Sequence, residues 1–299
     1  MAGAEVQWLM SNTFLYAVTV LIWGSTWLAI EYQLGVVEPE VSIVYRYALA
    51  SVVLFIWSKI RGLSLTFKVK DHLWFGLLGL FLFCLNYILA YRAQVYVTSA
   101  LAAIAFSMML WMNIVLSRVL FGTRAGGRVL FGALLGIVGI VVLFAPRIES
   151  VSFDDGVFFG SMLAMLGALM ASCGNMVSQA SQKRALPVLQ GNAWGMFYGA
   201  VITAIIAVVS GHEFNFDATF TYITSLVYLA IFGSVVAFGA YLTLLGRIGA
   251  HKAGYASVMF PVVALVLSIA FEGLQLDLSI VTGTSLVLLG NLLVLKKSA

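Results

Sequence analysis

Ten separate runs of apolar residues, each long enough to cross a lipid bilayer, constrain this chain more than any other feature. They cover approximately residues 13–33, 40–58, 73–91, 95–117, 129–146, 156–179, 190–210, 222–245, 252–271 and 279–295. A helix needs about 20 predominantly apolar residues to span the hydrocarbon core. The runs are continuously apolar, whereas the strands of a transmembrane β-barrel alternate. We therefore expect an all-α membrane protein with ten transmembrane helices.

The composition agrees with this expectation. Hydrophobic residues make up 62% of the 299 residues and charged residues only 9%, and the mean hydropathy is +1.05. Soluble domains carry about 25% charged residues. The formal net charge is +4, but the basic residues are scattered singly in short loops rather than gathered in a patch. We expect the lipid bilayer as a partner, and not a nucleic acid.

The positions of the basic residues predict the orientation of the chain. With ten spans, thirteen of the sixteen Lys and Arg residues fall on the side of the N-terminus. Arg92 and Arg147 fall on the opposite side, and Arg46 lies inside the second run. Because positive residues mark the cytoplasmic side, both termini are expected in the cytoplasm.

An internal repeat is visible at an offset of 151 positions. It places Gly122, Gly132 and Gly139 on Gly273, Gly283 and Gly290, and "VLS" at 115–117 on "VLS" at 266–268. Residues 1–150 and 151–299 would then be two five-helix repeats within one transmembrane domain. Because five is odd, the second repeat enters the membrane from the opposite side, which gives the inverted repeats of secondary transporters.

Polar and aromatic side chains recur at helical spacing inside eight of the runs. At membrane depth such side chains face the bundle interior or a watery cavity, although Ser, Asn and Gly also serve as interhelical contacts in any membrane bundle. The fifth and tenth runs are mainly Gly, Leu and Val and should stand outside a cavity. The expected substrate-binding residues are Trp23, Ser25, Trp27, Arg46, Tyr87, Tyr91, Ser107, Trp111, Asn175, Gln179 and Tyr241.

Arg46 is the only basic residue well inside a run. An unpaired arginine at this depth costs several kcal/mol, so it needs a partner. Glu31, at the outer end of the first run, is one candidate for a structural ion pair. The other is the carboxylate of a substrate, held by the guanidinium fork.

The chain lacks the residues that several other classes of function require. The chain has no phosphate-binding loop of the G-x-x-x-x-G-K-[ST] kind, and its three histidines fall at span ends or loops, so we expect no ATPase, no metal and no cofactor. An enzyme is the weaker class, because no buried His accompanies Ser25 or Ser107. Acidic residues gather at the outer ends of the runs, and none lies near the middle of a run, where many proton-coupled carriers use a buried acid. We therefore expect either facilitated transport down a gradient or coupling at Glu31.

Four motifs together resemble the EamA-type drug/metabolite transporter superfamily. They are "WGSTW" at 23–27, Arg46 in "VYRYALA", the turn "LAYRAQVYVTSALAAI" between the third and fourth runs, and the glycine-rich fifth and tenth runs. Within the superfamily the chain resembles bacterial exporters of aromatic and neutral amino acids. The resemblance implies efflux of small solutes through a cavity formed by helices 1 to 4 and 6 to 9.

We therefore expect an exporter of amino acids or similar small metabolites, multi-pass in the bacterial inner membrane and working by alternating access. Oligomerisation through helices 5 and 10 is compatible with their position outside the cavity. A drug or other metabolite carrier of the same fold stays an alternative, and so does an intramembrane protein that transports nothing.

Overall fold

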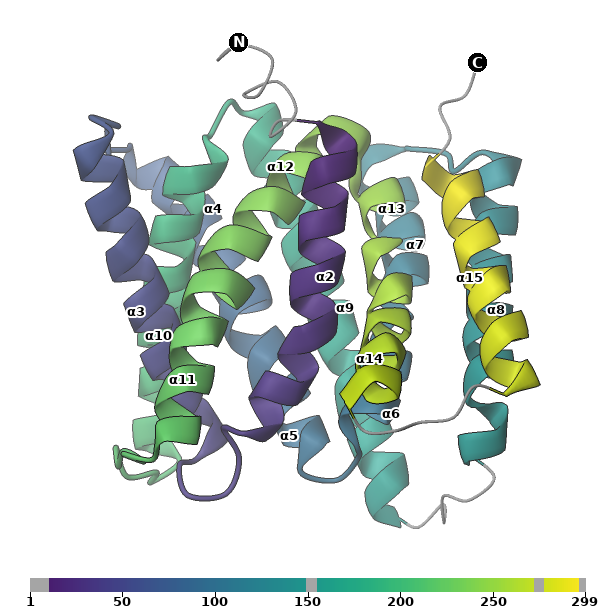
Figure 1. Ribbon diagram of the computed structural model, residues 1–299. Coiled ribbons are helices and arrows are strands. Elements are labelled where there is room, and N and C mark those ends of the chain that lie inside the picture. The colour runs from purple at the N-terminus through teal and green to yellow at the C-terminus, as the bar shows by residue number, and fades with distance from the viewer. Residues whose placement is uncertain (1–10, 149–154, 272–276, 296–299) are drawn as a thin grey trace, which may run out of the picture.

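The computed structural model describes residues 11–148, 155–271 and 277–295, and within these ranges the chain is a bundle of helices without strands (Figure 1). The all-α class is thereby confirmed for the described residues. The predicted boundary between residues 150 and 151 lies outside them. In chain order the helices are α2 (Asn12–Glu31), α3 (Pro39–Ile60), α4 (Val69–Leu78), η1 (Gly79–Leu85), α5 (Asn86–Gln94), α6 (Ser99–Phe106), α7 (Met109–Phe121), α8 (Gly127–Ile148), α9 (Asp155–Lys183), α10 (Val188–Val209), α11 (Phe220–Tyr228), η2 (Leu229–Val236), α12 (Ala237–Ile248), α13 (Ala250–Ala253), α14 (Ala256–Phe271) and α15 (Leu278–Leu295).

Eight helical stretches in the described ranges are long and apolar enough to cross a membrane. Some combine consecutive elements, since α4, η1 and α5 form one stretch from Val69 to Gln94. Two of the ten predicted spans are not among the eight. One coincides with α8, whose apolar part Gly127–Val142 is shorter, and the other with α13 and α14. The count of ten transmembrane helices therefore stays a prediction.

Local chemistry fixes several helix ends. The side chains of Ser11, Thr98 and Thr219 accept hydrogen bonds from backbone N–H groups three residues later, at 3.1, 3.4 and 3.3 Å, which satisfies donors that a helix start leaves open. Pro39 begins α3, where its missing N–H costs nothing. Gly122 ends α7 with a φ of 67°, a left-handed conformation that glycine adopts without strain. The beginning of α2 and the end of α15 lie at the same end of the bundle (Figure 1).

Two π-helical segments interrupt the third and eighth predicted spans at corresponding positions. The offset of 151 carries η1 (Gly79–Leu85) onto residues 230–236, nearly the whole of η2 (Leu229–Val236). A π-helical turn loosens the regular ladder of backbone hydrogen bonds and is frequent at functional sites. Gly79 allows close packing here, because a Cβ atom at this position would lie 2.7 Å from the carbonyl oxygen of Gly195 in α10.

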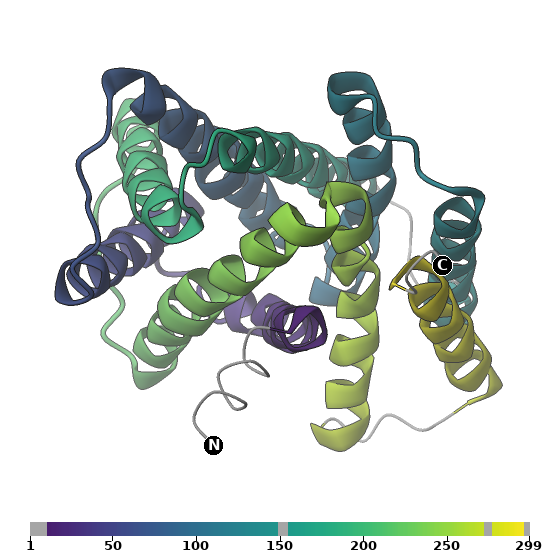
Figure 2. The same ribbon diagram turned by 90° about the horizontal axis from the view of Figure 1, so that it is seen from above.

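Helices α8 and α15 pack against each other at one side of the bundle, apart from the helices around its centre (Figures 1 and 2). Their contact is lined by glycines, with Gly132 facing Gly290 and Gly139 facing Gly283. Among the residues whose side chains the structure describes, neither helix contributes to the central cavity described below. The expectation that the fifth and tenth predicted spans stand outside the cavity agrees with this arrangement.

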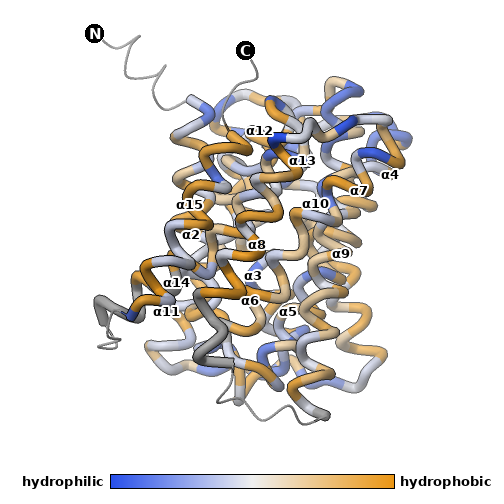
Figure 3. The backbone as a smooth tube through the Cα atoms, turned by 90° about the vertical axis from the view of Figure 1, so that its right-hand side faces the viewer, coloured by the Kyte–Doolittle hydropathy of each residue, from blue (hydrophilic) through white to orange (hydrophobic). Residues whose placement is uncertain are grey.

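Large apolar side chains cover the outside of the bundle. Val209, Phe220 and Leu292 are 82%, 83% and 67% exposed. Hydrophilic residues gather toward the two ends of the bundle, as Figure 3 shows. An apolar outer surface of this extent suits a lipid environment rather than water.

Candidate functional site

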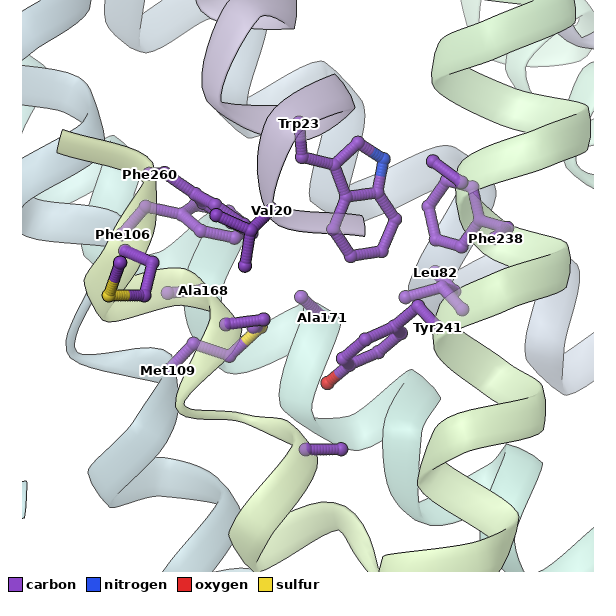
Figure 4. Packing of buried hydrophobic residues seen from close by; sticks show 14 of the residues in the cluster. Val20, Trp23, Leu82, Phe106, Met109, Ala168, Ala171, Phe238, Tyr241 and Phe260 are labelled. Carbon is purple, nitrogen blue, oxygen red and sulfur yellow. The ribbon is translucent and has the colours of Figure 1, made fainter. Parts of the chain in front are cut away.

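A cavity lies at the centre of the bundle, where α2, η1, α5, α6, α7, α9, α12 and α14 converge. The space between its atoms amounts to about 510 Å³ including the opening. Figure 4 shows buried hydrophobic side chains of this region, among them Trp23, Phe106 and Phe238 of the cavity lining. The lining residues are Trp23, Thr26, Trp27, Ile30, Leu82, Asn86, Tyr87, Ala90, Phe106, Met109, Ala171, Asn175, Phe238, Tyr241 and Phe260. A mainly apolar wall with a few convergent polar groups is typical of small-molecule sites.

Trp23 is fixed in the cavity wall by one hydrogen bond and three rings. Its indole Nε1 donates to the carbonyl oxygen of Gly233 in the π-helical segment η2 at 3.0 Å. The ring centroids of Phe238, Tyr241 and Phe260 lie 4.7, 4.9 and 5.8 Å from its own. Trp23 therefore joins the first predicted span to the eighth and ninth.

Trp27, one turn further along α2, forms the second aromatic wall. Its ring meets Phe106 of α6 edge to face, with a centroid distance of 5.4 Å. The backbone carbonyl of Trp27 accepts a hydrogen bond from Nε2 of Gln94 at 3.2 Å. The spacing of four residues on one helix brings both tryptophans to the same cavity.

A polar cluster of Asn113, Asn175 and Tyr241 lies at one side of the cavity. Asn175 is fully buried, and its Nδ2 donates to the hydroxyl of Tyr241 at 3.0 Å and to Oδ1 of Asn113 at 3.2 Å. Within the described part of the chain, Oδ1 of Asn175 has no hydrogen-bond partner, and neither has Oδ1 of Asn86. Two buried acceptors next to the cavity are therefore open to a ligand that donates hydrogen bonds.

Arg46 lies in a fully buried cage of hydroxyl groups behind the cavity wall. Its Nε donates to Ser234 at 2.9 Å, and its Nη1 and Nη2 donate to the hydroxyls of Tyr91 and Tyr87 at 3.4 Å each. The guanidinium carbon also lies 4.5 Å from the centroid of the Tyr87 ring. Glu31, the structural partner suggested by the sequence, is not among the partners of Arg46 in the described part of the chain.

The eleven predicted site residues divide into three groups. Trp23, Trp27, Tyr87, Asn175 and Tyr241 line the central cavity. Arg46 and Tyr91 lie directly behind it, in contact with Tyr87 or with each other.

The third group, Ser25, Ser107, Trp111 and Gln179, does not line this cavity. Ser25 is hydrogen-bonded to Tyr228 at 2.6 Å, and Ser107 donates to a carbonyl of its own helix, that of Ile104, at 2.6 Å. Trp111 is half-buried against the hydrophobic core. Gln179 accepts from the backbone N–H of Ala250 at 3.1 Å and lines a second cavity.

Several lining residues were not predicted from the sequence, among them Phe106, Met109, Phe238 and Phe260. An apolar side chain in an apolar run gives no signal of which way it faces, since lipid and cavity both accept it. Asn86 was detectable, because an amide inside a span is costly unless it faces the interior.

A second group of charges, outside the cavity, was also missed. Arg92 donates from Nε and Nη2 to the two carboxylate oxygens of Glu40, at 2.9 and 2.7 Å. Its Nη2 lies 3.5 Å from Glu38 and 3.3 Å from Nε2 of His212. Glu38, Glu40 and His212 have the spacing of metal ligands, but the guanidinium of Arg92 lies among them and supplies the positive charge.

Comparison with known proteins identifies the family. A model described as "EamA-like transporter family" matches residues 10–145 and 158–296. The "Uncharacterized transporter YoaV" of Bacillus subtilis is 24% identical over 272 residues, 90% of this chain and 91% of the relative. The "Uncharacterized inner membrane transporter YedA" of Escherichia coli is 26% identical over 255 residues, 85% of this chain and 80% of the relative.

A third relative and one solved structure complete the comparison. The "Probable amino-acid metabolite efflux pump" of Escherichia coli is 28% identical over 192 residues, 59% of this chain and 62% of the relative. A solved structure titled "Crystal structure of protein" shares the fold, with a TM-score of 0.75 at 20% identity, over 95% of this chain and 96% of that one. Because the family model matches most of the chain, in two segments, the protein is a membrane transporter that belongs to the EamA-like transporter family.

Proposed function

We propose that this transporter exports amino acids with aromatic or neutral side chains through the central cavity by alternating access. The observation that carries the proposal is Arg46. Its guanidinium is fully buried, and its hydrogen bonds within the described residues go to hydroxyl groups. A buried charge without an opposite charge is strongly unfavourable. A carboxylate that arrives with the solute supplies the missing charge.

Tyr87 connects this charge to the cavity. Its side chain lines the cavity and its hydroxyl accepts from Nη2 of Arg46. A solute carboxylate that reaches the Tyr87 hydroxyl would therefore lie next to the guanidinium, a group that binds carboxylates through two parallel hydrogen bonds.

The rest of the cavity suits the remainder of an amino acid. The side-chain oxygens of Asn86 and Asn175, which have no partner among the described residues, would accept hydrogen bonds from an ammonium group. Trp23, Trp27 and Phe106 provide ring faces and edges for an aromatic or aliphatic side chain.

The same proposal includes the topology. Two inverted five-helix repeats, residues 1–150 and 151–299, would place the cavity between them, as in other secondary transporters. The corresponding positions of η1 and η2 support this relation. The protein would lie in the inner membrane of a bacterium, with both ends of the chain in the cytoplasm. The outer faces of α8 and α15 would be the surface through which it oligomerises.

Flux of radiolabelled L-phenylalanine into proteoliposomes tests the proposal. Arg46→Gln should raise the KM about tenfold or more, because a charge-assisted pair of about 1.5–3 kcal/mol is lost. The matched control is Arg61→Gln, since Arg61 is exposed and lies over Trp57. Equal KM values for the two variants would refute the role of Arg46.

A screen of other solutes separates the alternatives. If the native protein moves cationic dyes or uncharged metabolites but no amino acid, it is a drug or metabolite carrier of the same fold. The screen should be run with and without a proton gradient, which also distinguishes coupled from facilitated transport.

A further inference from the structure

A groove opens on the outside of the bundle between α3, the loop that follows it and α10. The two helices pack against each other, and α3 stands at one edge of the bundle (Figures 1 and 2). The space between the atoms of the groove, including its opening, amounts to about 700 Å³. This α3–α10 groove is lined by Phe55, Ile56, Lys59, Leu65, Trp194 and Phe197.

Three aromatic rings form the wall of the groove. The ring centroid of Phe55 lies 5.0 Å from that of Trp194 and 6.2 Å from that of Phe197, and the last two lie 5.9 Å apart. The indole Nε1 of Trp194 donates to the carbonyl oxygen of Leu65 at 3.1 Å. Because its polar atom is bonded, the indole adds apolar surface to the groove. The wall therefore suits a hydrocarbon chain.

Apolar surface continues from the groove along both helices. Val52 and Ile56 of α3 are exposed, and so are Phe197, Val201 and Ile205 of α10. Residues four positions apart lie on the same face of a helix. A hydrocarbon chain that starts in the groove can therefore follow the outer surface of the bundle toward its middle.

Lys59 is the one charged residue that lines the groove. It is exposed and belongs to the last turn of α3. Within the described part of the chain its ammonium group forms no ion pair with an acidic side chain. A lysine places its aliphatic stem along apolar surface and keeps its charge at the polar end, so the groove has one apolar end and one cationic end.

The cationic end is reinforced by its neighbours in the sequence. Residues 59–71 contain four basic residues and one acid, and Arg61, Lys68 and Lys70 are exposed. The acid, Asp71, accepts a hydrogen bond from the backbone N–H of Lys68 at 3.2 Å. Basic pockets between helices at the cytoplasmic side bind anionic lipid headgroups. The charge of this segment complements such a headgroup.

We propose that the α3–α10 groove binds an anionic phospholipid of the cytoplasmic leaflet. One acyl chain lies on Phe55, Trp194 and Phe197, and the phosphate lies at Lys59. The choice of leaflet rests on the proposed topology, because α3 ends at the end of the bundle where α2 begins (Figure 1). A second copy of the chain is a poorer occupant, since two such basic segments would face each other.

Photo-cross-linking tests where the lipid binds. Phosphatidylglycerol with a diazirine in its acyl chain is compared with phosphatidylcholine that carries the same chain. We expect phosphatidylglycerol to label peptides that contain Ile56 and Phe197 several-fold more than phosphatidylcholine does. The control is Leu292 of α15, an exposed residue that any bilayer lipid reaches, where both lipids should react equally. Equal labelling by the two lipids in the groove would overturn the proposal.

The role of Lys59 is tested by titrating the detergent-solubilised protein with phosphatidylglycerol in native mass spectrometry. Lys59→Gln should raise the Kd about fivefold, the factor expected for one basic residue at an anionic membrane surface, and Lys59→Arg should restore binding. Lys70→Gln is the matched control, because Lys70 is exposed on the same segment but does not line the groove. An unchanged Kd in Lys59→Gln, or an equal rise in Lys70→Gln, would overturn the site.

Ile56→Cys tests whether a second copy covers the groove instead. In a chain that also carries Cys84→Ala and Cys173→Ala, we expect this variant to stay monomeric when it is oxidised in the membrane. A disulfide-linked dimer would overturn the lipid site. These three experiments need neither a transported solute nor an assigned leaflet, so a failure of amino-acid transport and a failure of the lipid site can be told apart.

Discussion

A Cβ atom added to Gly139 of α8 would lie 2.7 Å from the carbonyl oxygen of Gly283 in α15. One at Gly132 would lie 2.8 Å from the carbonyl oxygen of Gly290. Gly132 and Gly139 precede Gly283 and Gly290 by 151 positions, so each glycine faces the counterpart of the other. A twofold axis produces this reciprocal pairing, which supports the proposed inverted repeats.

Gly139→Ala should destabilise the protein, because the new methyl group meets backbone that cannot rotate away. Overpacking of this kind costs about 1–3 kcal/mol. Gly76→Ala is the control, since a Cβ atom at Gly76 in α4 would meet nothing within 4 Å. That variant should be neutral or slightly more stable. Unfolding in detergent measures both, and equal stabilities would contradict the close packing of α8 on α15.

Trp23→Phe should weaken solute binding as well as stability. The variant keeps an aromatic ring in the cavity but loses the hydrogen bond to Gly233, worth about 0.5–1.5 kcal/mol. Trp194→Phe is matched to it, because Trp194 donates in the same way to the carbonyl of Leu65, at 3.1 Å, away from the cavity. Both variants should lose similar stability, but only Trp23→Phe should raise the KM for transport. A normal KM in Trp23→Phe would remove Trp23 from the binding site.

The helices could be predicted from the sequence because hydropathy and helix length alone determine a membrane span. The two π-helical segments could not, since η1 and η2 read as uninterrupted apolar helix. They depend on contacts between helices, such as the close approach of Gly79 to Gly195.

The site could be predicted in part, for a related reason. Polar spacing placed Trp23, Trp27 and Asn175 on cavity-facing sides, because lipid excludes their polar groups. The partners of Arg46 were not predictable. Ser234 lies 188 positions away in the sequence, and Glu31 was the only carboxylate that spacing in the sequence suggested.

The stability of the protein should fall as the pH drops below about 7, in part because of His251 in the short helix α13. Burial, and then the neighbouring charge of Lys252, lower the pKa of His251 below its ordinary value of 6.5. The folded protein therefore holds this proton less tightly than the unfolded chain, so acid favours unfolding.

His251→Gln removes this contribution. Its melting temperature in detergent should fall less between pH 7.5 and pH 5.5 than that of the native protein. Identical falls in the two proteins would show that His251 does not contribute.

Glu40→Gln should destabilise the end of the bundle where Arg92 is bound. Glu40 is only 5% exposed and accepts two hydrogen bonds from Arg92, which is 35% exposed. Loss of a charge-assisted pair costs about 1.5–3 kcal/mol, and the exposure of Arg92 favours the lower figure. Glu38→Gln is the control, because Glu38 is 47% exposed and 3.5 Å from Arg92, and it should change stability by less than about 1 kcal/mol. Unfolding at low and high salt measures both, and a loss in Glu40→Gln no larger than that in Glu38→Gln would contradict this role for Arg92 and Glu40.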